Sequence, residues 1–165
     1  MKITVSKLRS IIREEITGVR KLPVLQDDVE LSCPAATQNL KLNTLNRNKA
    51  ISAPHIQYGP LNMADEAYWE RIAEHWNTSA DVAKESKCGN CGAFDISPRM
   101  NDCMPGEIMP QNKVMVALAT GEQWESLGYC WMHHFKCHSM RTCYTWTGGG
   151  PITDDSTSIS WEKNS

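Results

Sequence analysis

The sequence predicts a small α+β fold with irregular loops, a few helices and a short hairpin. Three observations lead to this prediction. The chain has 165 residues, of which 41% are hydrophobic, enough for one modest core. Apolar residues recur at helical spacing in two segments, 4–17 and 63–77. Two short apolar runs, 113–118 and 127–132, have the length of strands and flank a turn near Gly121.

Residues 1–21 predict a basic amphipathic helix. They carry six Lys or Arg and two Glu residues, whereas the rest of the chain carries 11 basic and 17 acidic residues. The apolar side chains Val5, Leu8, Ile12 and Ile16 fall on one face. An isolated helix of this length is marginal in water. We therefore expect it to lie on its own domain or a sister subunit, to act as a protein-targeting segment, or to anchor on an anionic surface.

Two further segments have little periodicity. Residues 22–62 contain four prolines and predict an extended arm that wraps over a neighbouring subunit. Cys33 stands alone in this arm, and we expect it to be a spectator. Residues 148–165 follow three glycines and predict a loosely held polar tail.

The cysteine-rich segment, 63–147, begins with the clearest helix. Residues 63–77 carry apolar side chains on one face, and Asn62 is a candidate cap. A second, shorter helix over 80–86 follows a cap at Thr78 or Ser79.

Six of the seven cysteines lie between residues 88 and 143, in the series Cys88-x2-Cys91-x11-Cys103-x26-Cys130-x6-Cys137-x5-Cys143. A C-x2-C pair lets two thiolates bind one metal or cluster from a single tight turn. We expect Gly89 and Gly92 to let this turn curl and to aim backbone N–H groups at sulfur. The chain has no apolar signal segment and no run of 18 apolar residues. We therefore expect a cytoplasmic protein without a membrane span, whose cysteines are metal ligands or reduced thiols rather than a disulfide framework.

The spacing leaves two kinds of centre open. Cys88, Cys91, Cys130 and His133 form a C-x2-C…C-x2-H series that suits zinc in a ribbon-like module. Aromatic residues crowd the same region: Phe94, Tyr129, Trp131, Phe135, Tyr144 and Trp146. A dense aromatic shell excludes water and protects an oxygen-sensitive cluster, which favours iron–sulfur over zinc.

Two stretches resemble the high-potential iron–sulfur proteins. Residues 87–95 read Lys-Cys-Gly-Asn-Cys-Gly-Ala-Phe-Asp, and Cys130-x12-Cys143-x2-Trp146 follows. That family places an aromatic residue soon after its C-x2-C pair and closes with a cysteine followed by x-x-Trp. The resemblance spans residues 63–147 and implies a single 4Fe–4S cubane that transfers one electron or acts as a structural staple. The implied ligands are Cys88, Cys91, Cys130 and Cys143, with Phe94 and Trp146 in the aromatic wall.

A second ligand register is also open. Cys103-Met-Pro105-Gly106 is similar to the Pro-Gly turn after the third cysteine of that family. The implied ligands would then be Cys88, Cys91, Cys103 and Cys130. Cys137 has no role in either register, and if Cys103 is also spare, the two cysteines could pair with each other.

The first fifteen residues, Met-Lys-Ile-Thr-Val-Ser-Lys-Leu-Arg-Ser-Ile-Ile-Arg-Glu-Glu, resemble the N-terminal segment of many otherwise unrelated proteins of marine tailed bacteriophages. This resemblance implies a phage protein, found in the host cytoplasm or in the virion. Its helix and arm would contact protein partners such as virion subunits.

These observations leave three expected functions and exclude others. The net charge of −2 gives no basic excess for binding nucleic acid. No catalytic triad order, phosphate-binding glycine loop or carboxylate pair stands out, so we do not expect an enzyme. The remaining functions are a 4Fe–4S protein, a virion structural protein that is compatible with such a cluster, and a zinc-ribbon-like interaction module.

Overall fold

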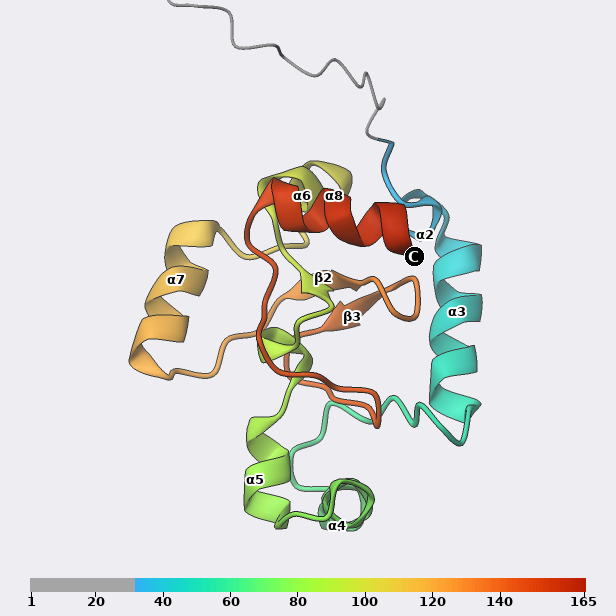
Figure 1. Ribbon diagram of the computed structural model, residues 1–165, viewed down its shortest axis with the longest axis vertical. Helices are drawn as coiled ribbons and strands as arrows, with labels where there is room; N and C mark the ends of the chain where they lie inside the picture. The colour runs from blue at the N-terminus through green and yellow to red at the C-terminus, as the bar shows by residue number, and fades with distance from the viewer. Residues whose placement is uncertain (1–31) are drawn as a thin grey trace, which may run out of the picture. The chain divides into compact units, whose positions relative to one another are not determined.

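A computed structural model describes residues 32–165 of the chain. Residues from Cys33 onward form one unit around a three-stranded antiparallel sheet, with the order β1-β2-β3. The strands are β1 (Phe94–Asp95), β2 (Leu127–Cys130) and β3 (Phe135–His138). Figure 1 shows helices arranged around this sheet. The mixed class of helix and strand that the sequence predicts is confirmed, whereas the predicted helix over 1–21 lies outside the described residues.

Seven helices and one 3-10 turn are present in residues 32–165. They are α2 (Ala35–Gln38), α3 (Leu40–Ser52), α4 (Glu66–Trp76), α5 (Ala80–Glu85), η1 (Cys88–Asn90), α6 (Pro98–Cys103), α7 (Gln111–Thr120) and α8 (Asp155–Asn164). The helices predicted over 63–77 and 80–86 correspond to α4 and α5. Asp65 rather than Asn62 caps α4, because its side chain accepts a 3.1 Å hydrogen bond from Tyr68 N. Ser79 caps α5.

The extended arm predicted over 22–62 is wrong where the structure describes it. Helices α2 and α3 occupy most of residues 35–52. Asn39 caps α3, because its side chain accepts a hydrogen bond from Leu42 N. Helix α3 lies beside the β2–β3 hairpin (Figure 1). Asn43 Oδ1 accepts a 2.7 Å bond from Lys136 N, so α3 belongs to the body of the protein. Residues 22–31 lie outside the described part.

The strand predicted over 113–118 is instead helix α7. An apolar run this short fits either structure, and here Val114 and Ala117, three residues apart, turn the same face inward. The helix ends at Gly121, which has a left-handed φ of 72°. The predicted strand over 127–132 exists as β2, but it pairs with β1 and β3 rather than with residues 113–118.

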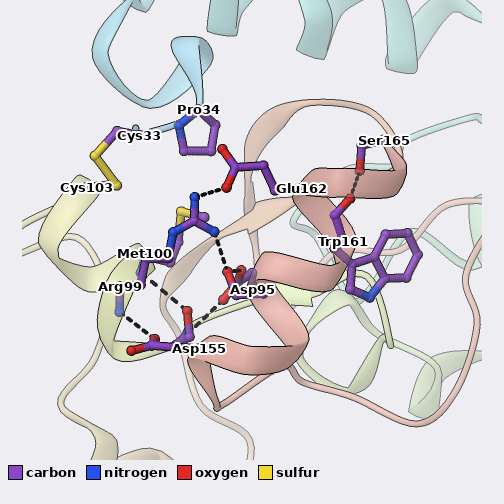
Figure 2. Close-up of polar contacts among 12 residues, drawn as sticks. Cys33, Pro34, Asp95, Arg99, Met100, Cys103, Asp155, Trp161, Glu162 and Ser165 are labelled. Carbon is purple, nitrogen blue, oxygen red and sulfur yellow. Dashed lines mark hydrogen bonds and ion pairs between the residues drawn. A yellow bond between two sulfur atoms is a disulfide. The ribbon is translucent and has the colours of Figure 1, made fainter. Parts of the chain in front are cut away.

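The loosely held tail predicted over 148–165 is also wrong, because its second half forms α8. Asp95 in β1 is fully buried and accepts hydrogen bonds from Trp131 Nε1 at 2.8 Å and Ser158 Oγ at 2.5 Å. Arg99 in α6 forms an ion pair with Glu162 in α8 (Figure 2). This buried polar network fixes the C-terminal helix to the sheet and to α6.

Within residues 32–165, no helix combines the length and the apolar character that crossing a bilayer would require.

Candidate metal centre

Five cysteines carry free thiols that influence one another's pKa values. They belong to Cys88, Cys91, Cys130, Cys137 and Cys143. Three separate segments supply them: the η1 turn, the β2–β3 hairpin and the loop after β3. The thiols of Cys88 and Cys130 each lie close enough to Cys91, Cys137 and Cys143 to change their pKa values. The four cysteines implied by the first register thus lie in one neighbourhood that also includes Cys137.

The C-x2-C turn is held by backbone hydrogen bonds to the chain after β3. Cys88 N donates to Arg141 O at 2.6 Å, and Gly89 N donates to Ser139 O at 2.8 Å. Gly92 N donates to Thr147 O at 2.8 Å. The two glycine amides thus fix the turn against neighbouring backbone.

The hairpin register explains why Cys130 and Cys137 lie near each other. Cys130 pairs with Phe135, and Cys137 pairs with Gly128. Residues two apart on one strand share a face, so Cys130 and Cys137 are diagonal neighbours on the same side of the ladder. This placement could have been found in the sequence only by recognising 135–138 as the second strand of the hairpin.

Backbone N–H groups point at three of the sulfurs. Cys91 accepts hydrogen bonds from the amides of Ala93 and Thr147, and Cys143 accepts one from the Thr145 amide. The sulfur of Cys130 accepts from the amides of Met132 and His133. Such N–H donors stabilise the thiolate form and are typical second partners of metal-bound or cluster-bound cysteine.

The electrostatic environment differs among the thiols. Burial raises the pKa of Cys91 to about 11 and the pKa of Cys143 to about 12. Burial, together with hydrogen bonds to Cys130 and Cys88, raises the pKa of Cys137 well above its usual value. The hydrogen bond from Cys137 lowers the pKa of Cys130. Without a cation, a buried group of thiols would therefore keep most of its protons.

A polar chain extends from Cys143 to the surface. Thr145 Oγ1 lies 3.2 Å from Cys143 Sγ and 2.7 Å from His133 Nε2. Burial lowers the pKa of His133, with smaller contributions from His55 and His134. The imidazole of His133 is therefore engaged with a hydroxyl group rather than directed at the thiols.

Aromatic residues enclose the sulfur group, although not only those that we predicted. Trp146 Nε1 donates to Lys87 O at 2.9 Å and so covers the C-x2-C turn. Phe94 is buried and stands opposite Cys130 in the sheet. The prediction missed Tyr58, whose hydroxyl accepts a bond from His138 N at 3.1 Å. It also missed Tyr68 as a neighbour of the thiols.

Tyr68 reaches the site from helix α4. Its hydroxyl donates to Thr142 O at 3.0 Å, and burial followed by the charges of Cys143 and Cys88 raises its pKa. Helical spacing places Tyr68 on the packed face of its helix, but no local pattern indicates that this face meets the cysteines. The Thr142 hydroxyl, directly before Cys143, is buried without a hydrogen-bond partner among the described residues.

The loop before α8 covers the other side of the turn. A Cβ on Gly150 would lie 1.8 Å from Cys91 O, so only glycine allows the two backbones to approach this closely. A cavity of about 640 Å³ lies beside the turn, lined by Gly89, Asn90, Trp124 and residues of α7 among others. The cysteines are thus enclosed, with an open hollow next to one edge.

The remaining two cysteines form a disulfide, Cys33–Cys103, with Cα atoms 5.4 Å apart. The prediction that Cys33 is a spectator is therefore wrong, and the expectation of metal ligands or reduced thiols does not hold for Cys33 and Cys103. The register that uses Cys103 as a ligand is also wrong, because its sulfur is bonded elsewhere. For the same reason Cys103 and Cys137 do not pair.

The spacing of the donors bears on the kind of centre. Among residues 32–165, no three His, Cys, Asp or Glu side chains are placed to hold one metal ion. The zinc site left open by the sequence, with Cys88, Cys91, Cys130 and His133, stays a prediction. Buried cysteines with backbone N–H donors at sulfur are a donor set of the kind that holds an iron–sulfur cluster.

Comparisons with known proteins give no relative: no protein-family model, no curated protein and no solved structure matches this chain.

Proposed function

We propose that this protein binds one 4Fe–4S cluster through Cys88, Cys91, Cys130 and Cys143. The observation that carries the proposal is the convergence of free thiols from three segments into one enclosed group, with backbone N–H donors at the sulfurs. Such donors stabilise the thiolate, which is the form in which cysteine binds a cluster. When bound, such a cluster supplies a one-electron redox couple.

The surrounding residues support two uses of the cluster. The aromatic residues Trp146, Phe94 and Tyr68 exclude water, which favours retention of a redox cluster. The four thiols also join η1, the hairpin and the loop after β3, so binding would hold these segments together and couple to folding. Electron transfer and structural stapling are thus compatible roles for the same site.

Composition analysis of anaerobically purified protein tests the proposal. We expect a brown protein with about four irons and four acid-labile sulfides per chain, the composition of a 4Fe–4S cluster. Replacing Cys143→Ser should abolish cluster loading. The matched control is the double variant Cys33→Ser/Cys103→Ser, which removes two cysteines outside the site and should load normally. A colourless protein with one zinc per chain would contradict the proposal.

The virion role stays a prediction, because the N-terminal segment that suggests it lies outside the described residues. Purified phage particles should then contain the chain in stoichiometric copies.

A further inference from the structure

A second cavity, of about 210 Å³, is lined by helix α3, the turn that follows it and the tip of the β2–β3 hairpin. Its polar side chains are those of Asn46, Lys49, His55, His133 and His134. We propose that this cavity binds a phosphate group, either as inorganic phosphate or as the end of a small phosphate ester. The inference is independent of the proposed cluster, because no described cysteine lines this cavity.

The charge around this cavity favours an anion. Its described lining residues belong to two stretches, 32–64 and 126–153, which contain Lys, Arg and His residues but no Asp or Glu. Lys49 takes no part in the salt bridges found within residues 32–165. Its ammonium group therefore has no counterion from the described lining residues, and a bound anion would supply one.

Three donor side chains reach the cavity from different segments. Lys49 lies on α3, His55 lies in the turn after that helix, and His134 lies between β2 and β3. A neutral imidazole already carries one N–H donor, so these contacts need no change of protonation. We do not count His133 as a donor, because its Nε2 lies 2.7 Å from Thr145 Oγ1. Donors from several directions suit a phosphate group, which has three acceptor oxygens, better than a planar carboxylate with two.

The backbone of His134 gives an independent reason to assign it a binding role. Its φ is 53°, in the left-handed region. Glycine and asparagine adopt this conformation most readily in hairpin turns, so histidine is less stable here than glycine. Residues held in such conformations cluster at ligand-binding sites. At this position the imidazole, which glycine would lack, is the group that lines the cavity.

Hydrogen bonds hold the walls of the cavity in place. Helix α3 lies beside the hairpin (Figure 1). Asn46 Nδ2 donates to His134 O at 2.7 Å, and Lys136 N donates to Asn43 Oδ1 at 2.7 Å. His134 N also donates to Cys130 O at 2.8 Å, which closes the turn. The donors are thus carried by segments that are fixed before binding, which lowers the entropy lost when a ligand binds.

The size of the cavity limits the ligand. Sites for larger organic molecules usually enclose roughly 300–1,000 Å³, whereas this cavity encloses about 210 Å³. The side chains of Lys49, His55 and His134 are exposed, so the site opens to solvent. A free phosphate, or a phosphate whose small ester group points outward, fits these dimensions.

Isothermal titration calorimetry of the full chain with inorganic phosphate tests the inference, at an ionic strength kept constant with sodium chloride. We expect one phosphate per chain. His134→Gly removes the imidazole and fits the left-handed backbone, so it should be at least as stable as wild type in urea. Its affinity for phosphate should nevertheless be about tenfold lower or less, the effect of losing one hydrogen bond to a charged group. Lys49→Gln should weaken binding similarly.

The control is Lys41→Gln, which removes a charge from an exposed position of α3 outside the cavity and should bind phosphate as wild type does. A parallel titration with methyl phosphate shows whether the site prefers the ester or the free ion.

Several results would overturn the inference. One is a wild-type protein that binds no phosphate at millimolar concentration, and another is wild-type affinity in both His134→Gly and Lys49→Gln. An equal loss in Lys41→Gln would assign the binding to general charge attraction. If His134→Gly proves unstable, Lys49→Gln decides, because its side chain is exposed and makes no salt bridge within residues 32–165. Phosphate binding by a protein that contains no iron would support this inference while contradicting the proposed cluster.

Discussion

Cys33 is covalently joined to Cys103, at a separation of 70 residues. The bond links the beginning of the body of the protein to the end of α6 and removes both sulfurs from the group around Cys88. The chain thus contains two separate kinds of sulfur chemistry, one covalent cross-link and one enclosed set of free thiols. This division determines which cysteine substitutions should affect stability alone.

We expect the double variant Cys33→Ser/Cys103→Ser to be less stable but to load the cluster. Cross-linking residues this far apart removes chain entropy from the unfolded state, worth about 4 kcal/mol in the loop-closure account. Urea unfolding of the metal-free variant and wild type measures the difference. Addition of a reducing agent should lower the stability of the wild type toward that of the variant. Equal stabilities, or a variant that cannot load iron, would contradict this separation of roles.

The buried carboxylate of Asp95 should be needed for the C-terminal helix to dock. Asp95→Asn keeps the shape of the side chain but replaces one acceptor oxygen by an NH₂ donor. In either orientation of the amide, this NH₂ group faces another donor, Ser97 N or Trp131 Nε1. We expect a loss of roughly 2 kcal/mol or more. Asp102→Asn, at an exposed position of α6, is the control and should change stability by less than about 0.5 kcal/mol. Chemical denaturation measures the stability of both variants. Similar losses in Asp95→Asn and Asp102→Asn would contradict a special role for the Asp95 carboxylate.

The metal-free protein should lose stability as pH rises. Burial raises the pKa of Cys91 to about 11 and of Cys143 to about 12, whereas an unfolded thiol has a pKa of about 8.5. The folded protein therefore keeps protons that the unfolded chain releases. The resulting stability is complete below pH 8.5 and is lost as pH rises through the folded pKa values.

Urea midpoints of the metal-free protein between pH 8 and pH 10.5, in steps of about half a unit, measure this loss. Tyr68 and Tyr129 also have raised pKa values because of burial, so a control is needed. In the variant Cys91→Ala/Cys143→Ala, the urea midpoint should fall less as pH rises. In cluster-loaded protein the fall should also be smaller, since the ligands are already thiolates. If the urea midpoint falls equally in the metal-free wild type, the double variant and the cluster-loaded protein, groups other than Cys91 and Cys143 cause the loss of stability.

The elements that local chemistry determines could be predicted from sequence. Helix α4 has apolar residues at helical spacing behind an acidic cap at Asp65, and α5 follows Ser79. Helix α7 could not be distinguished from a strand, because the run Val114–Leu118 is apolar on several sides and only its tertiary packing decides. Helix α3 has little amphipathic pattern, and it is held by long-range bonds such as that from Asn46 Nδ2 to His134 O.

The candidate site could be predicted only in part for the same reason. The C-x2-C pair and Cys130-x12-Cys143-x2-Trp146 indicate four of these thiols, because both patterns can be recognised from the spacing of residues along the chain. The presence of Cys137 depends on the β2–β3 register, and the contact with Tyr58 depends on how the chain after α3 folds back. The partner of Cys33 lies 70 residues away, and no local pattern identifies it.

Gly150 should be essential for enclosing the sulfur group, because a Cβ there would overlap Cys91 O at 1.8 Å. Gly150→Ala must displace either its own loop or the C-x2-C turn, and with it the Thr147 amide that donates to Cys91 sulfur. We expect reduced stability and a cluster that is lost more quickly in air. The control is Gly148→Ala, whose Cβ would make only an ordinary 3.4 Å contact with the Trp146 ring. Decay of visible absorbance after exposure to oxygen compares the variants. If both decay at the wild-type rate, the close approach of the loop to Cys91 does not protect the site.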